Sequence, residues 1–448
     1  MQSSNSHKTP RLCFLLTMLA TMLAMVLTTS CGRSLTATVT PVREASQLAS
    51  VSKGGTSAGS SDIDGQVVVM LAAGADPSAI AAAHQATLLE YEADEQSASL
   101  LPAAGQTSLE LQTSLSTDPR VASAEPNFWL ETAETRQQSF AFDDGSGTPQ
   151  TFAEQPAAEA IHVGQAHEIA DGTGVTVAIL DSGIDPRHPL LRRAYAGGID
   201  LVDGDDDPTD VKDATDNDGD GLIDEGFGHG THVAGIIHLV APEAKLLAVR
   251  VLDSDGRGSL FDIATGVRWA MEHGAKVINM SLGSLRGSDA LQNALAEAEA
   301  RGIVVISSAG NWGAESPVEF PAKSSHVAAI AAVDVAAVPA SFTSFGHNIA
   351  LSAPGVGVRS TYPGGGYRLW SGTSMSAPFV AGTCALLAEN HPEWSLAQML
   401  FRLAASAGPI VGEADDFGAG ALNTGAALEP DRRSRTEGTG GNEVVRQR

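Results

Sequence analysis

Three short segments of the 448-residue chain carry side chains suited to nucleophilic catalysis by a hydroxyl group, in the order Asp, His, Ser. Asp181 follows the apolar run 177–180, His229 opens the segment HGTHVAG, and Ser374 lies within SGTSMSAP. A hydroxyl becomes a strong nucleophile when a neighbouring base takes its proton, and a carboxylate can hold that base in the required tautomer. Singly, such residues are usually a turn aspartate, a structural histidine and an N-cap serine. Together they make Ser374 a candidate nucleophile, His229 a candidate base and Asp181 a candidate orienting carboxylate.

The elements predicted around these residues would bring them to suitable places. The apolar strand 175–180 delivers Asp181 at its carboxyl end, where open α/β sheets place their sites. Small neighbours leave the His229 imidazole uncovered at a helix start, and His232, one turn later, is expected to be structural. Ser374 begins an apolar helix, close to free backbone N–H groups and the positive end of the helix dipole.

The rest of the large region alternates short apolar runs with amphipathic helical stretches. Such runs, joined by helices, predict a mainly parallel, doubly wound α/β sheet that is covered on both faces. The expected strands are 175–180, 246–252, 277–282 and 303–307, and the expected helices are 260–273, 289–301, 374–389 and 395–405.

Taken together, the three motifs resemble the subtilase family of serine peptidases, over roughly residues 65–425. The resemblance implies a seven-stranded, mainly parallel sheet and hydrolysis of peptide bonds, with protein or peptide substrates. It also implies that Asn311, in the segment SSAGNWG, donates to the oxyanion together with the Ser374 backbone N–H. Two strand edges would pair with the substrate backbone, and a pocket of small residues would favour an apolar side chain before the cleaved bond. The residues implied for substrate binding are Gly258, Ser259, Ser281, Leu282, Gly283, Ala309 and Gly310.

A smaller unit precedes the large region. Its pattern predicts the order βαββαβ, which is ferredoxin-like, with Asp76 as the N-cap of its first helix and 121–125 as its last strand. Its ending, DPRVASAEPN at 118–127, resembles the end of a subtilisin propeptide, which implies a folding chaperone and inhibitor of the chain's own active site. An unrelated small domain remains the alternative.

The N-terminus has the composition of an export signal. Lys8 and Arg11 precede the apolar run 12–27, which ends in Thr-Thr-Ser-Cys. Ser30-Cys31 resembles a bacterial lipoprotein signal, in which Cys31 would be lipidated, although Thr28 departs from that pattern; ordinary signal cleavage is the alternative. The precursor would then be a cell-envelope lipoprotein and the mature enzyme extracellular. Cys13 would be removed, which leaves Cys384 without a disulfide partner.

These segments predict a domain order for the whole chain. The expected parts are a signal peptide with lipobox at 1–31, a tether at 32–64, a propeptide at 65–132, a linker with the processing region at 133–155, a catalytic domain at 156–428 and a disordered tail at 429–448.

The chain is acidic, with 27 basic and 53 acidic residues and a formal net charge of −26. Such a charge repels nucleic acid and anionic lipid, so neither is an expected partner, and membrane contact is expected only through Cys31.

An acidic loop before His229 resembles a calcium-binding loop of the EF-hand type. Phe227 stands where a bidentate glutamate should close such a loop, so Glu225 or a more distant residue would have to replace it. A solvated acidic loop is the alternative, and no organic cofactor is expected. The expected ligands are Asp216, Asp218, Asp220 and Asp224 with the Leu222 carbonyl, and a weaker second site would use Asp203, Asp205, Asp206 and Asp207.

Two other functions fit the same motifs. A catalytically inactive subtilase could serve as a surface binding protein, and the same three residues could catalyse ester or amide hydrolysis. The propeptide and the two strand edges favour an endopeptidase.

Overall fold

The structure is a computed structural model, and it describes residues 62–93, 96–136, 139–313, 318–412 and 416–429. The signal, Cys31, residues 32–61 of the expected tether and the expected C-terminal tail after residue 429 lie outside the described residues. Residues 62–64, expected at the end of the tether, instead begin the first strand of the small unit. All described residues belong to one compact unit, which spans Ala58–Arg448. No helix among the described residues is long and apolar enough to span a membrane.

A seven-stranded sheet forms the centre of the large region, in the order β12-β11-β10-β9-β5-β7-β6. Every neighbouring pair in it is parallel, which confirms the predicted fold class. The strands are β5 Thr176–Asp181, β6 Tyr195–Asp200, β7 Lys245–Arg250, β9 Val277–Met280, β10 Val304–Ser308, β11 Ala328–Val333 and β12 Ile349–Pro354.

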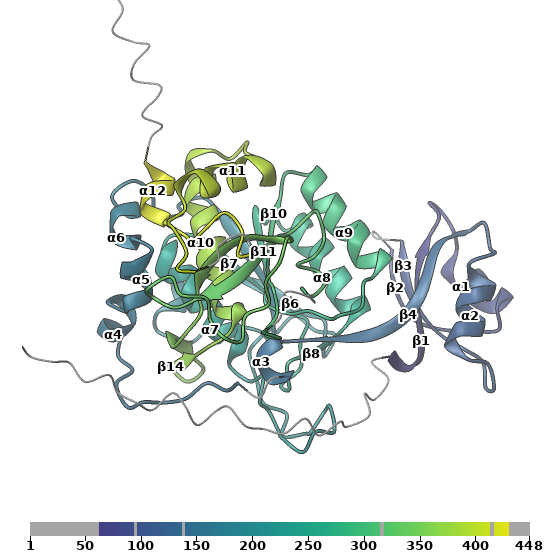
Figure 1. Cartoon of the computed structure of the whole chain (residues 1–448). Helices are drawn as coiled ribbons and strands as arrows, with labels where there is room; N and C mark the ends of the chain where they lie inside the picture. Colours follow the sequence, from purple (N-terminus) through teal and green to yellow (C-terminus); the bar gives the residue numbers. More distant parts are fainter. Residues whose placement is uncertain (1–61, 94–95, 137–138, 314–317, 413–415, 430–448) are drawn as a thin grey trace, which may run out of the picture. The chain divides into compact units, whose positions relative to one another are not determined.

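Helices cover both faces of this sheet (Figure 1). Val177 and Ile179 of β5 pack into the core that contains α7 and α10, whereas Ala178 and Leu180 face the core that contains α8 and α9. Because both faces are buried, the strands have the continuous apolar runs seen in the sequence. The helices are α7 His229–Val240, α8 Leu260–Glu272, α9 Asp289–Ala300, α10 Thr373–Asn390, α11 Leu396–Ser406 and α12 Thr424–Leu428.

Helix α10 contains a proline, Pro378, close to its start. Proline lacks an N–H, so the carbonyl of Ser374 loses its partner inside the helix. The hydroxyl of Ser281 donates to that carbonyl at 3.1 Å instead. The proline therefore ties the first turn of α10 to the end of β9.

The small unit follows the order β, α, β, β, α, β, and its sheet has the order β2-β3-β1-β4. The Asp76 side chain accepts from the Ser78 N–H and caps the first helix, as predicted. The elements are β1 Asp62–Leu71, α1 Pro77–Ala83, β2 Thr87–Glu92, β3 Ser97–Leu101, α2 Ser108–Leu115 and β4 Val121–Glu131.

Strand β4 is much longer than the predicted strand 121–125. Its first part pairs with β1, and its last three residues, Trp129–Glu131, pair antiparallel with β8 (Arg257–Ser259) of the large region. The extra residues of β4 are held in strand conformation by their pairing with β8. The sequence of β4 alone could not predict this pairing, because β8 lies far away in the chain.

The expected linker 133–155 is also more ordered than predicted. It contains α3 Ala133–Arg136 and α4 Pro149–Ala153, and α5 Pro156–Ala160 and α6 Val163–Ala166 follow. The segment packs on a hairpin that was not predicted, formed by β13 Val358–Tyr362 and β14 Gly366–Trp370. Phe142 forms a backbone bridge with Leu369, and the Trp370 indole donates to the Ser139 carbonyl at 2.8 Å.

Candidate active site

The predicted base and its carboxylate are in contact. His229, the first residue of α7, has its Nδ1 2.8 Å from Asp181 Oδ1 at the end of β5. Neither side chain is exposed to solvent. The ring of His229 meets Trp370 edge-on, with centroids 5.1 Å apart. The imidazole therefore has a fixed orientation, with Nε2 left for a reacting group.

Close backbone contacts bring His229 to this position. Gly228 precedes it with φ +88°, and a Cβ there would lie 2.3 Å from the Tyr362 ring. A Cβ at Gly230 would lie 2.2 Å from the Gly183 carbonyl oxygen. Glycine is therefore required on both sides of the histidine.

A buried aspartate that was not predicted caps the start of α7. Asp210 accepts from the N–H of Gly228 at 3.0 Å and from the N–H of Thr231 at 3.2 Å. The Thr231 hydroxyl also donates to it, at 2.7 Å. Burial raises the pKa of Asp210 to about 7. An aspartate 19 positions before the histidine has no motif around it, so the sequence did not indicate this role.

His232 is structural, as predicted. Its Nε2 lies 3.2 Å from the Arg368 carbonyl, and burial together with the charge on His229 lowers its pKa to about 3.

A glutamate of the chain itself occupies the position where a substrate would react. The hydroxyl of Ser374, in the first turn of α10, donates to Glu134 Oε2, which lies 3.4 Å from His229 Nε2. The carboxylate therefore connects the predicted nucleophile to the predicted base. Glu134 is fully buried and belongs to α3, within the expected linker.

The other oxygen of Glu134 is held by the two donors that were predicted for an oxyanion. Asn311 Nδ2 donates to Oε1 at 2.9 Å, and the Ser374 backbone N–H donates to the same oxygen at 3.3 Å. The Asn311 Oδ1 accepts from the N–H and the hydroxyl of Thr373, at 3.0 and 2.9 Å, which fixes the amide orientation. These are the two donors expected from the sequence, and they converge on one negatively charged oxygen.

Gly372 makes room for that oxygen. A Cβ at this position would lie 1.7 Å from Glu134 Oε1. Any side chain there would therefore fill the oxyanion site.

The charges of this cluster are coupled. Burial opposes the charge on His229, but the carboxylates of Asp181 and Glu134 outweigh it and raise the pKa of His229 to about 10. Burial likewise opposes the charge on Glu134, but its contacts with His229, Ser374 and Asn311 hold its pKa below the usual value. His229 and Glu134 therefore form an ion pair across the catalytic centre.

The segment before Glu134 lies between the two predicted edges. Trp129–Glu131 pairs with Arg257–Ser259, the edge that includes Gly258 and Ser259. On the other side, the Glu131 N–H donates to the Gly283 carbonyl at 3.1 Å, and the Gly283 N–H donates back at 2.8 Å. An extended peptide is thus held as the middle strand of three.

The remaining predicted pocket residues lie close by, although they make no backbone pair with this segment. Leu282 is buried in the core, and the Ser281 carbonyl lies 3.4 Å from the Ser374 hydroxyl. Ala309 and Gly310, which directly follow β10, are buried. Glu319, which was not predicted, lies against Gly283 and Gly310.

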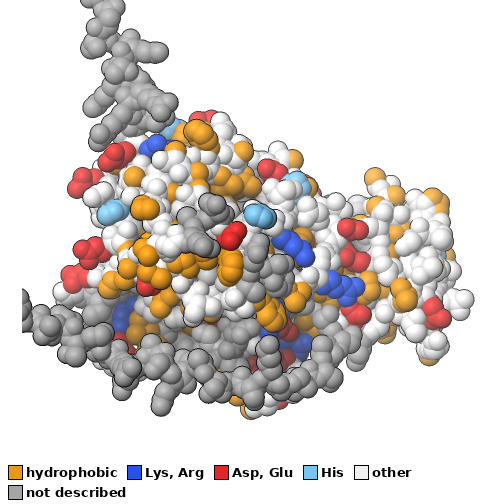
Figure 2. Space-filling model, in the orientation of Figure 1, with side chains coloured by type: hydrophobic (Ala, Val, Ile, Leu, Met, Phe, Trp, Pro, Cys, Tyr) orange, Lys and Arg blue, Asp and Glu red, His pale blue; other side chains and the backbone are white. Residues whose placement is uncertain are grey.

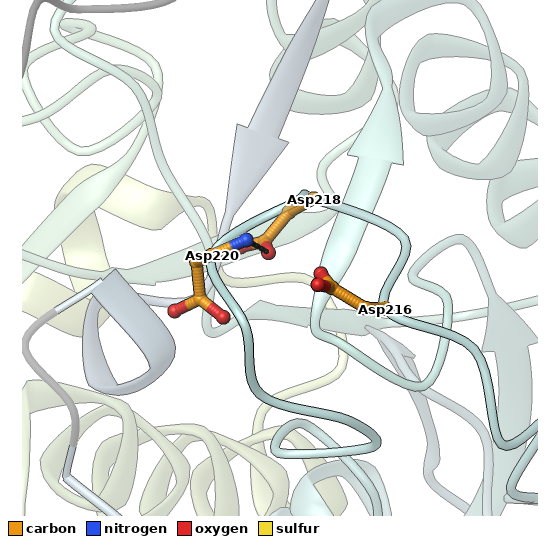
Figure 3. Close-up of side chains that lie close together, drawn as sticks. All are labelled: Asp216, Asp218 and Asp220. Atoms are coloured by element: carbon orange, nitrogen blue, oxygen red, sulfur yellow. Dashed lines mark hydrogen bonds between the residues drawn. The ribbon is translucent and has the colours of Figure 1, made fainter.

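The acidic loop brings together part of the predicted metal ligands. Carboxylate oxygens of Asp216, Asp218 and Asp220 lie within 4.8 Å of one another (Figure 3). Asp218 forms a second such group with Glu225 and Asp255, and Asp255 was not predicted.

Other acidic residues of this region do not join these groups. Asp224 Oδ1 accepts from the N–H groups of Asp213 and Ala214, and its place among the ligands stays a prediction. The predicted second site also stays a prediction. Asp203 pairs with Arg250, and Asp207 accepts from the Thr209 hydroxyl.

The surface reflects the excess of acidic residues. Figure 2 shows acidic side chains at several separate places on the visible face rather than in one patch. Cys384, the one cysteine among the described residues, is buried, and burial raises the pKa of its thiol to about 12.

Comparisons with known proteins agree with this geometry. Residues 172–439 match the model of the subtilase family. Subtilisin NAT from Bacillus subtilis subsp. natto is 40% identical over 270 residues, which cover 58% of this chain and 66% of that protein. The Bacillus pumilus subtilisin is also 40% identical, over 92% of its length. The chain thus spans about two thirds of some curated relatives and nearly all of others.

Two solved structures are similar as well. Fervidolysin from Fervidobacterium pennivorans, described as a keratinolytic enzyme related to subtilisin, has a TM-score of 0.68 at 25% identity, over 82% of this chain and 61% of that one. A Pseudoalteromonas arctica protease has a TM-score of 0.56 at 32% identity, over 60% of this chain and 93% of that one. With a seven-stranded parallel sheet and a family match over more than half its length, the chain belongs to the subtilase family of serine peptidases.

Proposed function

We propose that the chain is an exported serine endopeptidase that is made as an inactive precursor. One observation carries the proposal. The amide of Asn311 and the N–H of Ser374 point at the same oxygen of Glu134, whose other oxygen contacts both the Ser374 hydroxyl and His229. A hydroxyl, a base and two oxyanion donors around one point are what acyl transfer requires.

The proposed reaction follows from these positions. The Ser374 hydroxyl attacks the carbonyl carbon of a peptide bond while His229 Nε2 takes its proton. Asp181, 2.8 Å from Nδ1, stabilises the imidazolium that forms. Asn311 and the Ser374 N–H hold the negative oxygen of the tetrahedral intermediate. His229 then protonates the leaving amine, and a water molecule, deprotonated by the same imidazole, hydrolyses the ester on Ser374.

Casein and a short alkyl ester distinguish the proposed activity from its alternatives. We expect the processed protein to hydrolyse casein into peptides, because its two strand edges hold an extended main chain. Hydrolysis of the ester without hydrolysis of casein would favour an esterase. No hydrolysis of either would favour an inactive binding protein.

We also propose that residues 62–136 keep the precursor inactive and that Glu134 is the inhibitory contact. Strand β4 places the chain between the substrate-binding edges, and the Glu134 carboxylate fills the oxyanion site. Replacing Glu134 by Gln removes the ion pair with His229 but keeps the size of the side chain. We expect precursor processing, followed by gel electrophoresis over time, to become about 10-fold faster or more.

Glu131→Gln is the matched control, since its carboxylate is partly exposed and pairs with Arg136 outside the oxyanion site. We expect it to change the rate much less.

The rate of precursor processing should also depend on pH, in a direction that follows from the pKa of His229. The ion pair with Glu134 stabilises the inhibited precursor and raises the pKa of His229. This stabilisation is complete below about pH 6.5, where His229 is protonated, and it is lost as the pH rises towards about 10. Processing should therefore accelerate from neutral to alkaline pH, and Glu134→Gln should flatten that dependence. An equal pH dependence in the two proteins would contradict the inhibitory role.

A calcium ion at the acidic loop is a further part of the proposal. Both carboxylate oxygens of Glu225 are buried without a hydrogen-bond partner among the described residues. Burial, together with the nearby carboxylates of Asp255, Asp220 and Asp218, raises the pKa of Glu225 to about 7. A divalent cation would offset this repulsion, and oxygen-only ligands suit calcium. Because Gly226 follows and His229 begins α7, a bound ion would also fix the start of the catalytic helix.

Calcium removal should lower thermal stability. Saturation at about 100 times the dissociation constant contributes about 2.7 kcal/mol, which for a domain of this size corresponds to about 5–10 °C in Tm. The measurement is Tm from thermal melts in 1 mM calcium, taken as about 100 times the dissociation constant, and in EDTA. We expect the Tm in calcium to be higher by this amount. Glu225→Gln should reduce the difference, whereas Glu243→Gln, away from the loop, should retain it. Identical melts with calcium and EDTA would contradict the site.

Export with a lipid on Cys31 is proposed from the sequence alone. If the lipid stays with the N-terminal fragment that processing removes, the catalytic fragment should leave the membrane while the small unit remains attached. Detergent-phase partitioning of both fragments tests this. A processed catalytic fragment that stays in the detergent phase would contradict it.

A further inference from the structure

A buried carboxylate lies in the wall of the predicted specificity pocket. The side chain of Glu319 is 1% exposed. A Cβ at Gly283 would lie 2.5 Å from its Oε2, and a Cβ at Gly310 would lie 2.9 Å from its Cγ. The family resemblance implied that both glycines line the pocket, and their small size implied a preference for an apolar side chain. The space that they leave is taken by an acidic group rather than left open for an apolar side chain.

In the precursor, this carboxylate already holds a basic side chain. Arg136, two residues after the inhibitory Glu134, places Nη1 2.5 Å from Glu319 Oε1 and donates from Nη2 to the Gly283 carbonyl at 2.9 Å. The guanidinium carbon lies 5.7 Å from the centre of the Trp312 ring. A carboxylate, a backbone carbonyl and an aromatic ring together match the chemistry of a guanidinium group.

The carboxylate depends on a cation for its stability. Glu319 Oε1 also accepts from the Trp312 indole at 2.7 Å, but Oε2 has no hydrogen-bond partner among the described residues. Among the described residues, Arg136 is the cation paired with Glu319, and a buried carboxylate that loses such a partner retains a large desolvation cost. When the segment that carries Arg136 leaves the cleft, Glu319 will therefore favour another positive side chain at the same place.

We propose that Glu319 makes Arg or Lys the preferred side chain immediately before the cleaved bond. This inference rests on the proposed peptidase function and names its substrate class. It replaces the apolar preference expected from the small residues of the pocket. The alternative is that Glu319 serves only to hold Arg136 in the precursor and does not affect the processed enzyme.

Peptides that differ at one residue test the inference. We would measure kcat/KM of the processed enzyme for a fluorogenic peptide with Arg, Lys, citrulline or Phe before the cleaved bond. Citrulline has nearly the shape of arginine without its charge. We expect the Arg peptide to exceed the citrulline peptide by about 100-fold, because the charge pair forms in a buried place.

Two variants connect the preference to Glu319. Glu319→Gln keeps the side-chain volume, and we expect it to bring the Arg-to-citrulline ratio close to one while the Phe peptide is hydrolysed as well or better. Glu299→Gln, which alters a half-buried carboxylate paired with His326, should leave the ratio unchanged. If Glu319→Gln does not fold, the comparison of Arg with citrulline in the unaltered enzyme still decides.

The outcomes separate the inference from the function on which it rests. Hydrolysis of the Phe and citrulline peptides at rates equal to the Arg peptide would overturn the inference and leave the peptidase function intact. An unchanged ratio in Glu319→Gln would also overturn it. Failure to hydrolyse any of the peptides or casein would contradict the peptidase function itself.

Discussion

Replacing Ser374 by Ala is expected to lower kcat for casein by about a million-fold, a magnitude drawn from subtilisins. The hydroxyl is the only group in the described site placed to form the acyl intermediate, since it contacts the carboxylate that stands between it and His229. Loss of the hydroxyl leaves His229 and Asp181 without a nucleophile to activate. The measurement is initial-rate proteolysis by the processed form. A variant that cannot process itself would be produced as the catalytic domain, with its propeptide added as a separate chain.

A neighbouring serine provides the control for this prediction. Ser376 lies in the same first turn of α10 and is equally buried, but its hydroxyl faces Gly355 instead of the catalytic centre. Ser376→Ala should change kcat by no more than a few-fold. Equal losses in the two variants would indicate damage to the helix start rather than loss of a nucleophile.

Replacing Asn311 by Leu is expected to lower kcat by about 100- to 1000-fold with little change in KM. The amide donates to the oxygen that occupies the oxyanion site, and its replacement has similar volume without a donor. Because the oxyanion exists only during the reaction, the loss should appear in kcat. Steady-state kinetics with a single peptide substrate would separate the two constants.

Asn311 also accepts two hydrogen bonds from Thr373, so its replacement could disturb the loop. Asn311→Asp keeps these acceptors and removes the donor, and it should also lose at least 100-fold. Asn348→Ala, at an exposed amide, should be close to the unaltered enzyme. A large increase in KM with unchanged kcat would place Asn311 in substrate binding instead.

The sequence was sufficient to predict those features whose signals lie within one short segment of the chain. Asp181, His229, Ser374 and Asn311 each follow a strand or begin a helix within a short motif, and the structure brings all four around one point. The long helices were also predicted well. Helix α8 ends at Glu272 and α9 at Ala300, each one residue from the expected end. The periodic apolar faces and the caps that define these helices lie within their own short segments of sequence, so they could be recognised there.

The sequence was insufficient where a role comes from distant contacts. Glu134 contacts Ser374, 240 positions away, and Arg136 contacts Glu319, 183 positions away. Each is an ordinary acidic or basic residue in its own segment, so no local pattern distinguishes it. The same holds for Asp255, whose carboxylate joins Asp218 and Glu225.

The acidic loop at 216–225 shows a third case. Its alternating carboxylates were recognised, but spacing alone could not show that Asp224 caps the backbone of Asp213 and Ala214. The positive φ of 58° at Asp224 gives the loop a turn that an alternating pattern does not predict. Glu225 rather than Asp224 therefore faces the carboxylate group.

Covalent labelling of the processed enzyme with a fluorophosphonate, followed by mass spectrometry of its peptides, tests the central claim most directly. The arrangement of Ser374, His229, Asp181 and the oxyanion donors predicts one adduct, on Ser374, which is absent from Ser374→Ala and much slower to form in the precursor, where Glu134 covers the hydroxyl. Labelling of another residue, or no labelling of a processed and folded protein, would contradict it.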